Sequence, residues 1–154
     1  MDSNKQNKWD LRFIQMAELV ATWNKFEATK VGAVIVDPEF RVISTGFNGF
    51  PSGVVDQKIN NRERKLMRTI HAEVNAILFA RRDLTGCSIY VNYPPCACCT
   101  AKIIQVGIKR IVHTLPSDSF FEKWDESIVE SHLLISEAGI TLKILDGERL
   151  VYVK

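Results

Sequence analysis

His71-Ala72-Glu73 and Pro95-Cys96-Ala97-Cys98-Cys99 are the two stretches of sequence that decide the fold. Each follows a predicted strand or loop and stands at the start of a predicted helix. The helix of the first stretch is expected over 69–82, a segment rich in Ala, Glu, Leu and Arg, with Thr69 as its N-cap. The helix of the second stretch is expected over 96–106. We expect the two helix starts to converge on one site.

The segments around these helices have the composition of strands. Residues 31–36 form an almost unbroken β-branched run, and 41–47 resumes extended structure after Asp37-Pro38, which predicts a hairpin. Strands that alternate with helices indicate a three-layer α/β/α fold around a central mixed five-stranded sheet. The remaining predicted elements are helices over 9–22 and 125–138 and strands over 88–93, 108–114, 141–145 and 150–153.

Length and composition favour one domain spanning residues 1–154. The chain is 46% hydrophobic and 25% charged, which is enough apolar material for one core. Its net charge of +2 is too small for a sequence-independent nucleic-acid binder, so we expect no nucleic-acid partner. No apolar run is long enough to cross a bilayer, and residues 1–8 lack the apolar stretch of a secretory signal. We therefore expect a protein with no membrane partner in the cytoplasm, or in the host cytoplasm if the source is viral.

The cysteines are spaced for metal binding rather than for disulfides. Cys96, Cys98 and Cys99 crowd into four residues, where they could not all pair within the chain. A catalytic zinc takes three protein ligands and leaves one position open for water, and nitrogen and sulfur donors suit it. His71 with Cys96 and Cys99 provides that set. Because the positive end of a helix favours thiolate over thiol, the two sulfurs could hold zinc at neutral pH.

The other cysteines and histidines are not expected to bind a second metal. Cys98 lies inside the turn between the two ligand sulfurs and should point away from them, so we interpret it as a packing residue. Cys87 is a small apolar residue that leads into a strand. His113 and His132 are scattered in the sequence. We therefore predict one zinc ion per chain.

Glu73 gives the metal site a catalytic interpretation. Zinc in such a site lowers the pKa of its bound water to roughly 7, from about 15.7 in bulk water. Glu73 follows His71 by two residues, so its carboxylate can accept the water's proton. It can then protonate N3 of a pyrimidine ring and, in a later step, a departing amine. Either motif alone is weak evidence, since C-x-x-C is often a structural or redox pair and a lone helical histidine is usually a core residue. The pairing of H-x-E with P-C-x-x-C is typical of zinc deaminases.

A wider likeness covers most of the chain. The likeness is to the deoxycytidylate (dCMP) deaminase family. Residues 30–36 resemble its first strand, 46–53 its substrate loop and 71–77 its first zinc helix. The second zinc helix with the strand after it resembles residues 95–99, 102–105 and 107–108, and the family's late turn resembles 137–140. General nucleoside deaminases share the zinc motifs. The Asn-Gly-x-Pro loop and the Lys-Val-Gly-Ala strand favour the nucleotide branch. The resemblance therefore implies hydrolysis of dCMP to dUMP and ammonia, which would supply dUMP for thymidylate synthesis.

The resemblance also implies substrate contacts. It implies that Asn48 bonds the sugar hydroxyl, and that the backbone amides of Ala72 and Cys96 face the pyrimidine and the reacting centre. Lys30 is a phosphate candidate by its charge and its place beside a strand, and the alternative is a solvated surface lysine. Lys109 and Arg110 are weaker phosphate candidates.

An aromatic pair departs from the family. Members tend to have a tyrosine after the fourth strand, near the pyrimidine. This chain has Phe120 and Phe121 there, which keep stacking and lose a hydrogen bond. We expect Phe121 to contact the substrate.

Regulation is implied by the resemblance alone. Family members are commonly homohexamers that dCTP activates and dTTP inhibits, with Mg²⁺ accompanying the effector near the substrate loop. Phe47, Gly49 and Phe50 would form this effector loop. The family's loop usually reads Gly-Tyr-Asn-Gly, and Phe47 lacks the tyrosine hydroxyl. The expected regulation therefore depends on a loop that departs from the family's pattern.

The sequence leaves other functions open. The chain could instead be a relative of the dCMP deaminases that acts on dCTP or CMP, or on adenosine in tRNA. Its modest net charge argues against tRNA. The chain could also be a catalytically inactive, zinc-stabilised binding module. Such a module would have no use for Glu73 beside the open zinc position.

Overall fold

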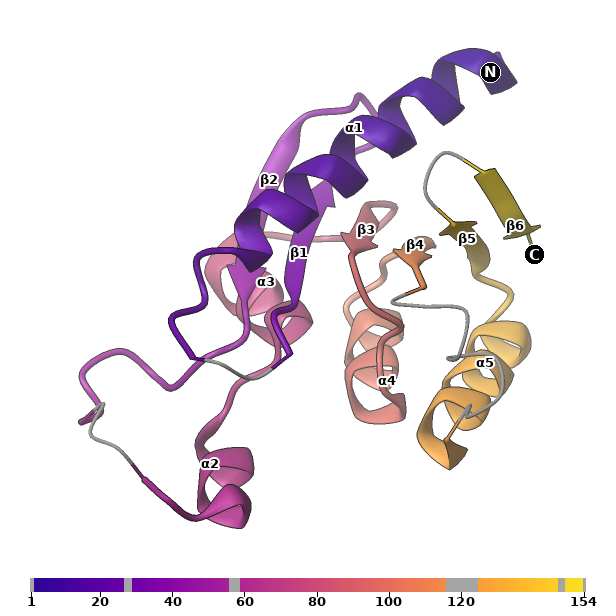
Figure 1. The fold of residues 1–154 in the computed structure, drawn as a ribbon. Coiled ribbons are helices and arrows are strands. Elements are labelled where there is room, and N and C mark those ends of the chain that lie inside the picture. Colours follow the sequence, from indigo (N-terminus) through magenta and orange to yellow (C-terminus); the bar gives the residue numbers. More distant parts are fainter. Residues whose placement is uncertain (1, 27–28, 56–58, 116–124, 147–148, 154) are drawn as a thin grey trace.

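The computed structural model describes residues 2–26, 29–55, 59–115, 125–146 and 149–153. Its strands are β1 (Gly32–Val36), β2 (Val42–Phe47), β3 (Ser88–Val91), β4 (Arg110–Thr114), β5 (Thr141–Asp146) and β6 (Arg149–Val153). They form one mixed sheet in the order β2-β1-β3-β4-β5-β6 (Figure 1). β3, β4 and β5 are parallel, whereas β1 pairs antiparallel with β2 and β3, and β6 pairs antiparallel with β5.

Helices cover both faces of this sheet. The helices are α1 (Ser3–Ala21), α2 (Arg62–Arg68), α3 (Ala72–Ala80), α4 (Ala97–Gln105) and α5 (Glu126–Ala138). α1 covers one face, α3, α4 and α5 cover the other, and α2 lies apart from the sheet (Figure 1). The predicted three-layer α/β/α fold is confirmed. Its sheet has one strand more than the five expected, because Arg149–Val153 pairs with β5 at the edge.

Strand β1 explains how one sheet serves two cores. Successive side chains of a strand point to opposite faces. Val34 and Val36 therefore pack against α1, and Ala33 and Ile35 pack on the side of α3, α4 and α5. Both sides are covered, so every residue of β1 is buried and the strand reads as a continuous apolar run.

A buried polar network ties α1 to the sheet. Asp10 is fully buried, and its carboxylate accepts hydrogen bonds from the Tyr90 hydroxyl at 2.6 Å and from Lys143 Nζ at 2.7 Å. Arg110 donates two more, at 2.7 and 2.6 Å. Arg110 was a weak phosphate candidate, and this assignment is wrong, because its guanidinium is held by Asp10 on the α1 face of the sheet.

The first helix is longer than its apolar pattern indicates. We expected residues 9–22, and the helix spans Ser3–Ala21. Its start is fixed by Asp2, whose side chain accepts a hydrogen bond from the Asn4 amide at 3.0 Å. The first turns carry mostly exposed polar side chains, so apolar periodicity could not reveal them.

The segment before the first metal motif differs from its prediction. One helix was expected over 69–82 with Thr69 as its N-cap, but the chain forms α2, breaks, and begins α3 at Ala72. Thr69 lies at the end of α2, where its hydroxyl donates to the Lys65 carbonyl at 2.6 Å. Ile70 is extended and pairs with Gly49 of the 46–53 loop. The break therefore ties this loop to the start of α3.

The other elements agree with their predictions to within a few residues. Asp125 caps α5 by accepting from the Ile128 amide at 2.9 Å, and Gly139 ends it in the left-handed conformation. Across the described residues, no helix combines the length and apolar character that crossing a membrane requires.

Candidate metal centre and active site

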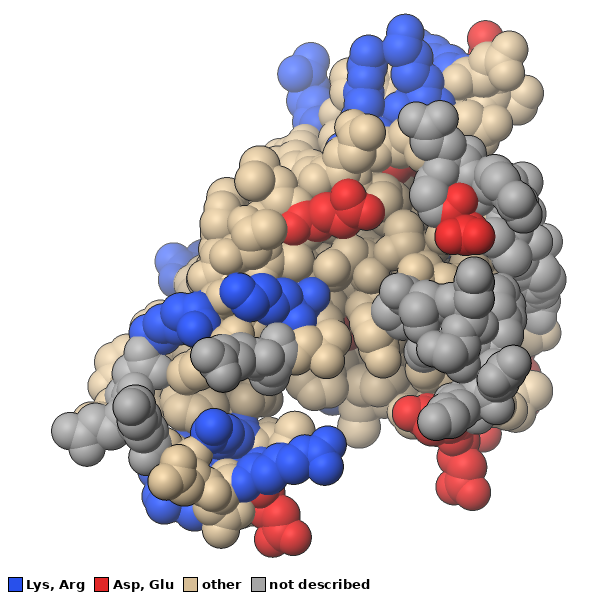
Figure 2. Space-filling view, in the orientation of Figure 1, with Lys and Arg blue, Asp and Glu red and all other residues tan. Residues whose placement is uncertain are grey.

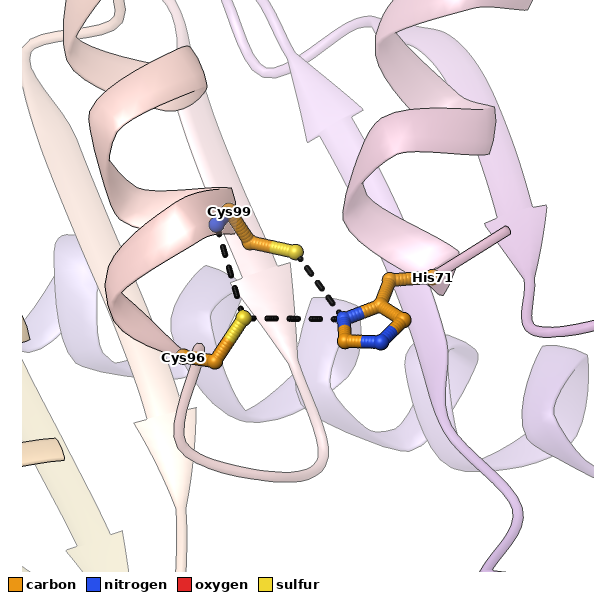
Figure 3. A group of neighbouring side chains, drawn as sticks. All are labelled: His71, Cys96 and Cys99. Atoms are coloured by element: carbon orange, nitrogen blue, oxygen red, sulfur yellow. Dashed lines mark hydrogen bonds between the residues drawn. The ribbon is translucent and has the colours of Figure 1, made fainter. Parts of the chain in front are cut away.

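Three side chains from two helix starts converge at one end of the sheet. His71 is the N-cap of α3, Cys96 is the N-cap of α4, and Cys99 lies in the first turn of α4. Figure 3 shows the imidazole and both sulfurs pointing toward one another. Their candidate ligand atoms all lie within 4.8 Å of one another.

The spacing of these atoms fits a zinc ion. With Zn–N of about 2.0 Å and Zn–S of about 2.3 Å, a nitrogen and a sulfur ligand of a tetrahedral site stand roughly 3.5 Å apart. His71 Nδ1 lies 3.2 Å from Cys99 Sγ and 3.6 Å from Cys96 Sγ. One nitrogen and two sulfur donors leave the fourth position for another molecule, which is the donor set of a catalytic zinc.

Electrostatics prepares one of the two thiols to bind metal. Hydrogen bonding with Cys99, helped by His71, lowers the pKa of the Cys96 thiol to about 4. The same contact with Cys96, together with burial, raises the pKa of Cys99. The hydrogen bond with Cys96 also raises the pKa of His71. These contacts therefore favour the thiolate form of Cys96, which is the form that ligates metals.

Glu73 lies beside the three ligands in the first turn of α3. It is buried, with 3% of its surface exposed. Burial raises the pKa of its carboxyl, and hydrogen bonding with Cys99 and the charge of His71 oppose that rise. A carboxyl that is harder to ionise than usual suits a group that both takes up and gives back a proton.

A cavity of about 910 Å³ opens over these residues. This volume falls in the usual range for small-molecule sites. His71, Glu73 and Cys96 lie in its wall. Phe26 and Phe50 also line it, and their ring centroids are 4.9 Å apart. The cavity thus joins a metal-binding corner to an aromatic wall on which a flat ring could pack.

A family comparison identifies this arrangement. Residues 7–115 match the model of the cytidine and deoxycytidylate deaminase zinc-binding region. The chain belongs to this deaminase family. The match includes His71, Glu73, Cys96 and Cys99.

Named relatives span most of the chain. An uncharacterized deaminase in the luxG 3′ region of Aliivibrio fischeri is 49% identical over 135 residues, covering 87% of this chain and 91% of that protein. Human deoxycytidylate deaminase is 35% identical over 144 residues, covering 88% and 79%. The fold also resembles the crystal structure of dCMP deaminase from the cyanophage S-TIM5 in complex with dCMP and dUMP. That likeness has a TM-score of 0.73, 21% identity, and coverage of 94% of this chain and 99% of that one.

The family's sugar-contact candidate, Asn48, lines the cavity. Its Oδ1 accepts hydrogen bonds from Asn24 Nδ2 at 2.8 Å and from the Val31 amide at 2.9 Å. Its Nδ2 donates to the Thr29 carbonyl at 2.9 Å. These three contacts fix the orientation of the Asn48 amide, and its sugar contact stays a prediction. Asn24 was not singled out, because only the fold brings it to Asn48.

The other substrate and effector candidates of this chain lie in different surroundings. Phe50 and Ala72 line the cavity. Phe47 is 38% exposed and packs edge-on against Trp23, with ring centroids 6.2 Å apart. Gly49 exchanges backbone hydrogen bonds with Ile70. These positions do not test the substrate and effector roles that the resemblance implies.

The remaining predicted residues lie elsewhere. Lys30 is exposed and is not among the residues that line the cavity. Phe120 and Phe121 fall outside the described residues. Cys98 is exposed rather than packed, whereas Cys87 is buried as expected.

His113 and His132 stack with ring centroids 5.9 Å apart, although they are distant in sequence. Among the described residues, the group of three candidate metal ligands is His71, Cys96 and Cys99. The number of zinc ions per chain stays a prediction.

Proposed function

We propose that the protein is a zinc-dependent deaminase that hydrolyses dCMP to dUMP and ammonia. The observation that carries this proposal is the buried Glu73 carboxyl beside three metal-ligand side chains in the wall of one cavity. Relatives named deoxycytidylate deaminase, at 34% to 36% identity in mouse, human and yeast, support the choice of substrate. The inactive binding module is not favoured, because it gives Glu73 no role.

His71, Cys96 and Cys99 would hold the zinc ion. Zinc bound there supplies a Lewis acid that makes a water molecule acidic enough to attack at neutral pH. Glu73 accepts a proton from the attacking water and donates it to ring N3. In a later step it takes the proton of the new hydroxyl group at C4 and passes it to the amino group at C4. A C–O bond forms at C4, the C–N bond breaks, and ammonia leaves. Burial of Glu73 keeps bulk water from this proton transfer.

A substrate panel tests the proposal. The zinc-loaded protein would be incubated with dCMP, dCTP, CMP, deoxycytidine and an adenosine-containing RNA while ammonia release is followed. We expect the highest kcat/KM with dCMP. Faster turnover of another cytosine nucleotide would change the substrate but keep the mechanism, and no turnover of any of them would overturn the proposal.

The domain organisation, location, assembly and regulation of the protein are proposed from its resemblance to the dCMP deaminase family. We propose a single domain over 1–154 that works in the cytoplasm as a homohexamer, activated by dCTP and inhibited by dTTP. Mg²⁺ would accompany the effector near Phe47, Gly49 and Phe50. Light scattering and rate measurements with each nucleotide, with and without Mg²⁺, test these points. A monomer whose rate neither nucleotide changes would contradict them.

A further inference from the structure

The described residues of the cavity wall carry charges of both signs. Among the described residues of the wall, Glu73 is the acidic one, and its carboxyl interacts with the metal-ligand candidates Cys99 and His71. The basic side chains in the wall are Lys25, Arg62 and Lys65. The described residues of the wall therefore carry more positive than negative charge even before a metal cation is added. A ligand that is neutral at one end and anionic at the other matches this pattern.

Helix α2 contributes two of these basic residues from one face. Arg62 and Lys65 are spaced at i and i+3, which puts them on one side of the helix, and both line the cavity. Thr69, the C-cap of α2, also lines it. Arg64 is not part of the cavity wall. Lys and Arg side chains gather around α2 (Figure 2).

No contact within the described part of the chain explains the position of the Arg62 and Lys65 side chains. Neither contributes to the core, since no residue of α2 is buried. Neither forms an ion pair with another residue in the described part of the chain. Lys25 lies elsewhere in the cavity wall with its ammonium 6.0 Å from the Phe26 ring centroid. An anion in the cavity would thus meet the positive charges of Arg62 and Lys65 from helix α2.

We propose that Arg62 and Lys65 recognise the phosphate group of the substrate and so select a nucleotide over a nucleoside. This inference rests on the proposed deaminase function. A phosphate monoester carries a charge of roughly −1.5 to −2 at neutral pH and three acceptor oxygens. The planar guanidinium of Arg62 can bind two of these oxygens at once, and the Lys65 ammonium adds a point charge. The assignment replaces Lys30, the phosphate partner expected from the sequence.

The test compares dCMP with deoxycytidine, which differ only in the phosphate. Arg62→Gln and Lys65→Gln should each lower kcat/KM for dCMP roughly 10-fold, mainly through a higher KM. Turnover of deoxycytidine should stay within about 2-fold of wild type, because the chemistry at the other end of the cavity is intact. That unchanged rate also serves as evidence that the variants are folded.

Arg64→Gln is the matched control, since it removes the same charge from the same helix outside the cavity wall. It should leave dCMP turnover unchanged. Wild-type kcat/KM for dCMP in both Arg62→Gln and Lys65→Gln would overturn the inference. So would a loss of dCMP turnover in Lys30→Gln while those two variants behave as wild type.

Binding of dUMP separates a failure of this inference from a failure of the proposed function. dUMP carries the phosphate but has no amino group to lose, so its affinity can be measured by calorimetry without turnover. Weaker dUMP binding in Arg62→Gln and Lys65→Gln than in Arg64→Gln supports phosphate recognition even if no cytosine compound is deaminated. Equal dUMP affinity in all three variants refutes it.

Discussion

Gly46 on β2 lies so close to α3 that a β-carbon on it would stand 2.4 Å from the backbone nitrogen of Ala76. Real β-carbons do not approach backbone atoms so closely, so alanine at this position must push α3 away from the sheet. We expect Gly46→Ala to lower the free energy of unfolding by about 1–3 kcal/mol. Because α3 begins directly after His71, zinc content should fall too. Chemical denaturation and metal analysis measure both effects. At Gly49 no atom lies within 4 Å of the added carbon, so unchanged stability in Gly49→Ala is the control. Equal stability of the two variants would contradict the prediction.

Glu73→Gln should separate metal binding from catalysis. The amide is nearly the same size but cannot take up the proton, so we expect kcat for dCMP to fall by about 10²–10⁴-fold. Zinc content should match wild type, because Glu73 is not one of the three proposed ligands. The control is Glu137→Gln on the exposed side of α5. Activity within a few-fold of wild type would remove Glu73 from the proton transfer.

Cys98 and Cys99 are adjacent in sequence but differ in their surroundings. Cys99 is buried against His71, and Cys98 is exposed. Cys99→Ser should lose most of the bound zinc and the activity, since a hydroxyl is a far poorer zinc ligand than a thiolate. Cys98→Ser should keep both. Metal analysis of the two purified variants decides the matter, and zinc loss from Cys98→Ser alone would reverse the ligand assignment.

Asp10 balances two cations in the interior. Burial alone would raise the pKa of Asp10, but hydrogen bonds from Arg110, Lys143 and Tyr90 lower it to about 2. Asp10→Asn leaves Lys143, which is 4% exposed, without its counter-ion. We expect the free energy of unfolding to fall by about 3–5 kcal/mol. Glu18→Gln makes the same charge change on the exposed side of α1 and should cost much less. Urea denaturation at neutral pH compares them, and equal losses would mean that burial of the pair is not the cause.

His113 should make stability fall in mild acid. Its ring is fully buried, and burial lowers its pKa to about 4. The unfolded chain, with an ordinary pKa of about 6.5, takes up a proton between these values that the folded chain resists. The contribution of the neutral His113 ring to the free energy of unfolding is therefore complete above pH 6.5 and is lost as the pH falls. The loss reaches about 3 kcal/mol near pH 4. His113→Gln does not titrate, so its unfolding free energy should fall less steeply between pH 7 and pH 4. Parallel curves for the two proteins would contradict this assignment.

The metal group could be predicted because its chemistry is local. The two-residue gap between Cys96 and Cys99 puts both sulfurs at one helix start, and His71 opens a second helix with Glu73 in its first turn. The sheet was predictable for a similar reason, since strands such as 31–36 carry their own apolar signal.

What the sequence could not reveal depends on contacts between distant segments. α2 has no buried residue, so its charged sequence gave no amphipathic pattern, and Thr69 was assigned to the wrong helix. The same gap hid Arg62 and Lys65, whose place in the cavity wall follows from where α2 sits. Asn24 reaches Asn48 only after the chain has folded across 24 positions.

The sheet keeps the ionic network of Asp10 and the metal ligands on opposite faces. Among the described residues no hydrogen bond or ion pair joins the two groups, so we expect changes in the ionic network to alter heat resistance more than turnover. Protein engineers could redesign the inner face of α1 for robustness while leaving the reaction chamber untouched, and could alter α2 for a different nucleotide without weakening the scaffold.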